Sequence, residues 1–106
     1  MLPKIRRLSR VNFLIANNNG KTLRNNFFWI KVLSNNLDFN RFAIVTSTKL
    51  SKSAVTRNRL RRDIYKTVEK ICGNFDIIIF PKQSMLKLTN EEIGVEINKT
   101  VSEIPN

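Results

Sequence analysis

Apolar residues recur at helical spacing in the middle of the chain. Four of them fall on one face, at i, i+4, i+8 and i+11: Leu60, Ile64, Val68 and Ile71. This spacing predicts an amphipathic helix. Ser53 can cap its start by accepting a hydrogen bond from an exposed amide of the first turn, and Gly73 with Asn74 is typical of a helix end.

A short helix is predicted before it. Ser9 can cap a segment that runs to about Ala16 and carries Phe13 and Ala16 on one side. We expect Asn17 to Gly20 to end this helix, because asparagine and glycine tolerate a left-handed backbone.

A last helix is predicted near the other end. Thr89 and Glu92 have the spacing of a capping box. Its apolar stripe follows: Ile93, Ile97, Val101 and Ile104.

Four other segments read as strands: 21–24, 27–33, 39–48 and 75–80. Alternation along 27–33 places Phe27, Trp29 and Lys31 on one face. We expect 39–48 to pair back on 27–33 as a hairpin across a polar turn. The continuous apolar run 75–80 predicts a strand interior to the sheet, which Pro81 closes before a loop over 82–88.

The order of elements is therefore αβββαβα. It predicts one α+β domain over residues 1–106, a mixed sheet of about four strands packed with three helices as an α/β sandwich. The central strand–helix–strand connection would normally be right-handed.

Charge is distributed unevenly along the chain. Nineteen Lys and Arg stand against eight Asp and Glu, and residues 1–72 hold 16 of the basic and three of the acidic residues. A one-signed field of this size usually serves a polyanionic partner. The hydrophobic content of 42% argues against a disordered basic tail.

The outer face of the central helix concentrates this charge. Arg59, Arg62 and Lys66 lie opposite the apolar stripe, Asn58 and Arg61 flank it, and Arg57 lies nearer the apolar side in the first turn. A charged helix face is commonly only a solvated face, but this face carries no compensating acid until Asp63 and Glu69. The basic segment 1–10 reads equally as a phosphate-contacting arm and as a solubilising terminus.

Several kinds of chemistry are excluded by composition. The chain has no histidine and one cysteine, which excludes a histidine-based nucleophile and an ordinary zinc site. Cys72 cannot form an intramolecular disulfide, and we expect it to be a small buried hydrophobe. No apolar run approaches the ~20 residues of a membrane span, and residues 1–10 lack a signal-peptide pattern. We expect a cytoplasmic protein without membrane contact.

A long motif resembles the signature of the bacterial ribonuclease P protein component. It runs from Ser47 to Arg62 as S-x-K-L-x-K-x-A-V-x-R-N-R-x-R-R. The resembling residues are Ser47, Lys49, Lys52, Ala54, Val55, Arg57, Asn58, Arg59, Arg61 and Arg62. The likeness extends to Phe13, Asn25, Phe28 and the segment 76–79.

The resemblance implies a subunit of an endoribonuclease, a hydrolase of tRNA processing whose active site lies on a catalytic RNA that uses Mg²⁺. No catalytic residue and no metal are then expected on this chain. The partners implied are the catalytic RNA, in a 1:1 complex with a monomeric protein, and the 5′ leader of precursor tRNA. The family's central crossover is left-handed, against the general rule.

The resemblance also assigns surfaces. The basic helix would face the catalytic RNA through Lys49, Lys52, Arg57, Asn58, Arg59, Arg61, Arg62 and Lys66. A cleft between the first helix and the sheet would hold the leader through Phe13, Phe27, Trp29 and Lys31. Two departures weaken stacking there: Asn17 stands where a second aromatic is usual, and Lys31 where a tyrosine is common.

Two other functions fit the basic helix. A structural RNA-binding protein, such as a ribosomal component, would share the helix without needing a leader cleft. A DNA-binding module would use the helix in the major groove, but the second short helix of a helix-turn-helix is not predicted.

Overall fold

The computed structural model describes residues 4–104. The first three residues of the basic N-terminal segment lie outside this range. The elements, in chain order, are η1 Lys4–Arg6, α1 Arg10–Asn19, β1 Lys21–Arg24, β2 Phe28–Ser34, β3 Arg41–Ile44, α2 Ala54–Val68, β4 Phe75–Pro81, η2 Gln83–Lys87 and α3 Asn90–Ser102. This is the predicted αβββαβα order, with two 3₁₀ turns added; η2 occupies the segment predicted as a loop.

The four strands form one mixed sheet in the order β1-β2-β4-β3. β2 pairs antiparallel with both β1 and β4, and β3 pairs parallel with β4. The predicted hairpin between 27–33 and 39–48 is therefore wrong, because β4 lies between these strands. The apolar run of β4 is buried from Asp76 to Ile79, which requires a central position with both edges paired.

The segment between β2 and β3 passes over the end of β4 instead of turning tightly. Asn35 anchors it: its amide nitrogen donates to the Asp76 carboxylate at 2.9 Å and its side-chain oxygen accepts from the Leu37 N–H at 3.0 Å. Its backbone N–H donates to the carbonyl of Asn74 at 2.8 Å. The polar turn is thus a crossover held by asparagine.

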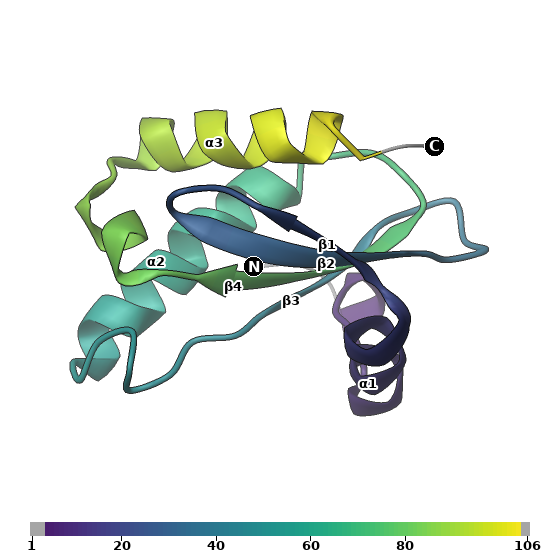
Figure 1. Cartoon of the computed structure of the whole chain (residues 1–106), viewed down its shortest axis with the longest axis horizontal. Helices are drawn as coiled ribbons and strands as arrows, with labels where there is room; N and C mark the ends of the chain where they lie inside the picture. Colours follow the sequence, from purple (N-terminus) through teal and green to yellow (C-terminus); the bar gives the residue numbers. More distant parts are fainter. Residues whose placement is uncertain (1–3, 105–106) are drawn as a thin grey trace.

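The helices cover the two faces of the sheet unequally. α2 and α3 pack on one face, and α1 contacts β2 and β4 on the other. In Figure 1, α3 lies above the sheet and α1 below one end of it. The core between the sheet and α2 and α3 contains Phe28, Ile30, Val32, Phe42, Ile44, Leu60, Ile64, Tyr65, Val68, Ile77, Ile79, Ile93 and Ile97.

The helix starts agree with their predicted caps. The hydroxyls of Ser9 and Ser53 accept from the amides of Asn12 and Thr56, at 3.3 and 3.2 Å. At α3, Thr89 and Glu92 form a complete capping box, with bonds of 2.9 and 3.2 Å. These local signals are readable because each bond joins residues three apart.

Two helix ends differ from prediction. α1 continues to Asn19, and Gly20 has an ordinary φ of −75°. Glycine is needed there for a close approach, since a Cβ would lie 2.5 Å from the carbonyl oxygen of Ala16. α2 ends at Val68, five residues before Gly73, whose positive φ of 157° carries the chain past the buried Asn40.

The end of α2 is instead held from a distance. The Arg6 guanidinium donates to the carbonyls of Glu69 and Ile71 at 2.9 and 3.2 Å. A cation suits the negative end of the helix dipole. The turn after this end leaves Cys72 exposed, so its expected burial is wrong.

Candidate nucleic-acid interface

The inward face of α2 packs on the core, which leaves its basic residues on the outward face. Leu60, Ile64, Tyr65 and Val68 are buried beneath the helix. The residues on the outside are all exposed: Asn58, Arg59, Arg61, Arg62 and Lys66. The predicted ridge of cations is therefore a real surface of the helix.

These cations keep their charge available. Within residues 4–104 the one ion pair shorter than 4.0 Å joins Arg41 to Asp76 at 2.8 Å, on the sheet. Asp63, the one acid of α2, is engaged by Asn90: with its amide turned so that nitrogen faces the carboxylate, Asn90 donates at 2.7 and 3.1 Å. An exposed guanidinium with no internal acid can bind phosphate bidentately.

Arg57 occupies a different position from its neighbours. Its side chain is half-buried, and Nη1 donates to the carbonyl of Ser51 at 2.7 Å. It therefore fixes the loop that enters α2. Arg57 therefore lies nearer the apolar side of α2, as predicted, and in the free protein its side chain binds the backbone of the preceding loop.

Lys49 and Lys52 lie in that same loop and are both exposed. The loop is anchored by Leu50, which is buried in the core, and by Gln83, whose amide donates to the carbonyl of Lys49 at 2.8 Å. The two lysines thus extend the basic face of α2 beyond its N-terminus on a fixed backbone.

The N-terminal segment is docked on the sheet. Arg7 bridges to Phe42, and the N–H of Leu8 donates to the carbonyl of Phe42 at 3.0 Å. While Arg6 holds the end of α2, Lys4 and Arg7 are exposed beside Arg61, around a shallow hollow at the β3 edge. The described part of this segment is an ordered extension of the basic surface.

The sheet face opposite the core is only partly covered. Ala16 of α1 and Ile78 of β4 are buried on this side, and Phe13, one turn before Ala16, is half-buried. Beyond the helix, Trp29 and Phe80 stack face to face, with ring centroids 3.8 Å apart and planes 4° from parallel. The result is an aromatic platform beside α1.

Lys31 joins this face to α1. Its ammonium donates to the backbone carbonyl of Asn17 at 2.6 Å. The two residues that depart from the family pattern are therefore in contact with each other. A cation at the last turn of α1 satisfies a carbonyl that has no partner within the helix.

Phe27 does not lie with Trp29. The structure places it against the core, beside Leu88 and the acidic side of α3. The alternation of β2 starts only at Phe28, because Asn25 makes a turn whose side-chain oxygen accepts from the N–H groups of Phe27 and Phe28 at 2.8 Å each. Phe80 takes the place beside Trp29; its position in the apolar run 75–80 gave no sign of which face it would occupy.

The acidic groups of the described chain do not gather into a metal-binding cluster. Asp76 is buried and accepts from Arg41 through both of its oxygens at 2.8 Å. This hydrogen bond, with the attraction of the carboxylate, raises the pKa of Arg41 against the opposing effect of burial. Among residues 4–104, no three side chains of His, Cys, Asp or Glu converge. The same residues contain no helix long and apolar enough to span a membrane.

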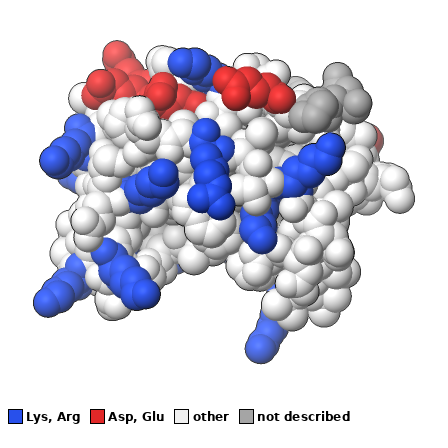
Figure 2. All heavy atoms as spheres, in the orientation of Figure 1, with Lys and Arg blue, Asp and Glu red and all other residues white. Residues whose placement is uncertain are grey.

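The two signs of charge occupy different parts of the surface. Figure 2 shows acidic side chains gathered along the edge where α3 lies, with basic side chains spread over the rest of the visible face. A polyanion would therefore be attracted to α2 and the sheet and repelled from the outer side of α3.

Comparison with known proteins gives a consistent family match. The family model described as Ribonuclease P matches residues 2–105. The chain is 33% identical over 107 residues to the ribonuclease P protein component of Desulforapulum autotrophicum, covering 96% of this chain and 91% of that one. It is 36% identical over 84 residues to the same component of Synechocystis sp., covering 74% and 68%.

A solved structure has the same fold. The RNase P protein from Thermotoga maritima superposes with a TM-score of 0.85 at 25% identity, covering 94% of this chain and 98% of that one. A match of this quality requires the same hand of the β3–α2–β4 crossover, because the opposite hand would put α2 on the other face of the sheet. The connection therefore has the hand of the family.

Proposed function

The chain belongs to the ribonuclease P protein family, and from this premise we propose that it binds a catalytic RNA through α2 and the leader of precursor tRNA through the open face of its sheet. It is a protein subunit of ribonuclease P, an endoribonuclease of tRNA processing. The observation that carries the proposal is the row of exposed, unpaired cations on α2.

The α2 surface suits a folded RNA. Arg59, Arg61 and Arg62 project from a rigid helix, and Lys49 and Lys52 continue the surface on an anchored loop. Arginine binds phosphate with two parallel hydrogen bonds and also stacks on bases. The fixed spacing of these groups favours an RNA of defined shape over a flexible strand.

The hydrolytic step belongs to the RNA in this proposal. The chemistry requires Mg²⁺. Asp76 is bound by Arg41, Asp63 is bound by Asn90, and residues 4–104 contain no cluster of three acidic side chains that could hold the ion. Magnesium prefers several oxygen ligands in octahedral geometry, which RNA phosphates supply. The protein's contribution is to bind and orient the two RNAs.

The leader would lie between α1 and the Trp29–Phe80 stack. An aromatic platform next to cations binds single strands without sequence preference, because every base has a flat face. Phe13 supplies the α1 side of this cleft, and Phe27 is excluded from it by its contact with the core. Lys31 contributes charge near the end of α1, although its ammonium already bonds to Asn17.

This assignment is tested first by reconstitution. Adding the protein to a cognate catalytic RNA should restore cleavage of precursor tRNA at a low Mg²⁺ concentration at which the RNA alone is nearly inactive. A folded protein that gives no such rescue would contradict the proposed function. We expect a 1:1 complex by sedimentation and, since the substrate is a precursor tRNA, a cytoplasmic location.

The leader cleft is tested by a matched pair of aromatic residues. Trp29→Ala and Phe13→Ala should each weaken binding of precursor tRNA by about tenfold relative to mature tRNA, because a stacked base contributes about 1–3 kcal/mol. Phe27→Ala should leave that ratio unchanged. Affinities are measured with the reconstituted enzyme. If Trp29→Ala and Phe13→Ala weakened the binding of precursor and mature tRNA equally, the leader cleft would lie elsewhere.

A further inference from the structure

A second recess lies on the other side of α2, away from the leader cleft. It is a groove of about 620 Å³ between α2, η2 and the start of α3. Its accessible apolar surface comes from Leu86 and Leu88, which are partly exposed, because Leu60, Met85 and Ile93 beneath it are at most 3% exposed. Its rim is charged, with Arg59, Asp63 and Lys66 on the α2 side. The groove therefore has a small apolar wall on the η2 side and a cationic rim on the α2 side.

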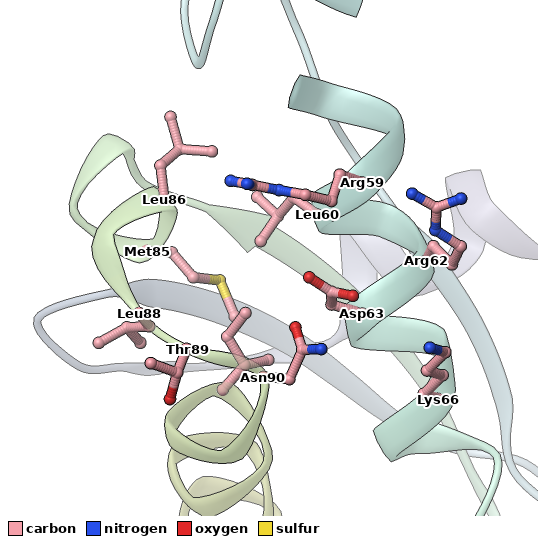
Figure 3. Close-up of a pocket in the computed structure, with 11 residues that line it drawn as sticks. Arg59, Leu60, Arg62, Asp63, Lys66, Met85, Leu86, Leu88, Thr89 and Asn90 are labelled. Carbon is pink, nitrogen blue, oxygen red and sulfur yellow. The ribbon is translucent and has the colours of Figure 1, made fainter. Parts of the chain in front are cut away.

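Side chains of the rim are arranged for two kinds of contact. Figure 3 shows Arg59 reaching from α2 toward Leu86 of η2, while Asp63 and Asn90 face one another across the groove. Leu86 is only partly buried and packs on the core. A ligand entering here would meet aliphatic carbon on the η2 side and a guanidinium on the α2 side.

Asp63 is unusual among the acids of the chain. It lies between basic residues of α2 without forming an ion pair shorter than 4.0 Å, and Asn90 donates to its two oxygens at 2.7 and 3.1 Å. A carboxylate has about four acceptor sites, so two remain for a ligand. The remaining sites lie on opposite edges of the carboxylate, so a base edge with two adjacent N–H groups would bind by displacing the amide of Asn90, an exposed residue.

We propose that this groove binds one unpaired nucleotide of the RNA that contacts α2, an inference that rests on the proposed function. The base lies on Leu86 and Leu88, and its phosphate is held by Arg59 and Lys66. Asp63 accepts from the base, which favours a base with an exocyclic amino group, above all guanine with its neighbouring N1–H and N2–H₂. A phosphate alone would not use the apolar wall of Leu86 and Leu88, and an apolar ligand would not use the rim.

The free protein supplies the first test, independent of any catalytic RNA. In amide NMR titrations, guanosine monophosphate should shift Asp63, Leu86 and Asn90 and bind about tenfold more tightly than uridine monophosphate or ribose 5-phosphate, because a good two-bond contact to a base edge discriminates by about 1–3 kcal/mol. Equal affinities for the three probes, or shifts confined to other surfaces, would overturn the proposal.

Matched substitutions sharpen this test. Asp63→Asn keeps the size of the side chain and should remove the preference for guanosine monophosphate, and Leu86→Ala should weaken all base-containing probes. Asp38→Asn and Leu37→Ala lie in the β2–β3 crossover and should change neither. Binding that is unaffected by Asp63→Asn and Leu86→Ala, with both variants folded, would contradict the assignment.

The complex supplies the second test. Kethoxal modifies unpaired guanine at N1 and N2, so bound protein should protect a guanine of the catalytic RNA, and Asp63→Asn should expose that nucleotide while the rest of the footprint persists. If the complex formed but no guanine showed this behaviour, the groove would not be a nucleotide site, and the proposed function would still hold. If the wild-type protein bound no catalytic RNA at all, the proposed function would fail, and the mononucleotide titrations would still decide the groove.

Discussion

α2 and α3 are built alike on the inside and differ on the outside. Both lie on the same face of the sheet, begin with a hydroxyl cap and bury a stripe of aliphatic side chains at i and i+4. Outside, α2 carries five basic residues and one acid, whereas α3 carries three acids and one lysine. Two helices with the same packing role have opposite surface charge.

The difference is also visible at the helix ends. α3 places Glu91 and Glu92 in its first turn, where the helix dipole favours negative charge. α2 has no acid in its first turn and carries Arg57 there. α3 follows the rule for a stable isolated helix, and α2 departs from it. Basic residues continue along the outer face of α2. This composition is better explained by binding to a polyanionic partner than by stabilisation of the helix.

The shared interior gives the largest expected effect. Ile64→Ala in α2 and Ile97→Ala in α3 should each lower the free energy of unfolding by about 2–5 kcal/mol, because both side chains are at most 1% exposed and leave a cavity. Val55→Ala and Val95→Ala are the controls, at 79% and 64% exposed, and should cost less than about 0.5 kcal/mol. Urea unfolding measures the free energy of unfolding of all four variants. If only one of the two isoleucine variants were strongly destabilised, the two helices would not contribute equally to the core.

The next largest effect is expected on RNA binding, because the outer faces of α2 and α3 have opposite charge. Replacing both Arg59 and Arg62 by Ala should make the dependence of log affinity on log salt shallower by about 2, since each lost phosphate contact removes roughly 0.9 from the slope. Near 0.1 M salt this corresponds to about 60-fold weaker binding of the catalytic RNA.

The control for that experiment is on α3. Glu91→Ala with Glu96→Ala removes two charges from the outer side of the other helix and should change affinity by no more than about twofold. Filter binding over a series of salt concentrations measures both variants. Equal effects on the two helices would mean that the protein responds only to net charge, and that α2 is not the contact surface.

Local patterns in the sequence predicted much of the fold and the basic face. The stripe Leu60, Ile64 and Val68, the caps at Ser9, Ser53 and Thr89, and the short strand 21–24 are all confirmed. Each of these signals depends on residues a few positions apart. The exposed position of Arg59 and Arg62 followed directly from the stripe, because a helix with one buried face leaves the other outside.

Contacts between distant residues explain the failures. The pairing of 39–48 was wrong because the sequence gives no local sign that β4, some thirty residues later, inserts between β2 and β3. The end of α2 was misplaced because Arg6, 63 residues before Glu69, binds the carbonyls just past Val68. Phe80 was missed as the partner of Trp29 because a strand that is apolar on both faces does not reveal which face is open.

The smallest effect is expected from a substitution that gives the start of α2 the capping pattern of α3. Thr56 occupies the third helical position, where α3 has Glu92, so Thr56→Glu would complete the capping box with Ser53. The hydrogen-bond gain is small, because the Ser51 hydroxyl already accepts from the N–H of Ser53 at 3.2 Å. The favourable charge at the helix start should raise the free energy of unfolding by about 0.5 kcal/mol.

The same change should weaken RNA binding severalfold, since it places a negative charge beside the loop of Lys49 and Lys52. Thr56→Gln separates the two causes: glutamine can form the same side-chain bond without charge, so it should leave RNA affinity nearly unchanged. Urea unfolding and filter binding on the two variants measure both consequences. If Thr56→Glu stabilised the protein and bound RNA as well as the wild type, the N-terminal end of α2 would lie outside the interface, and its lack of acids would need another cause.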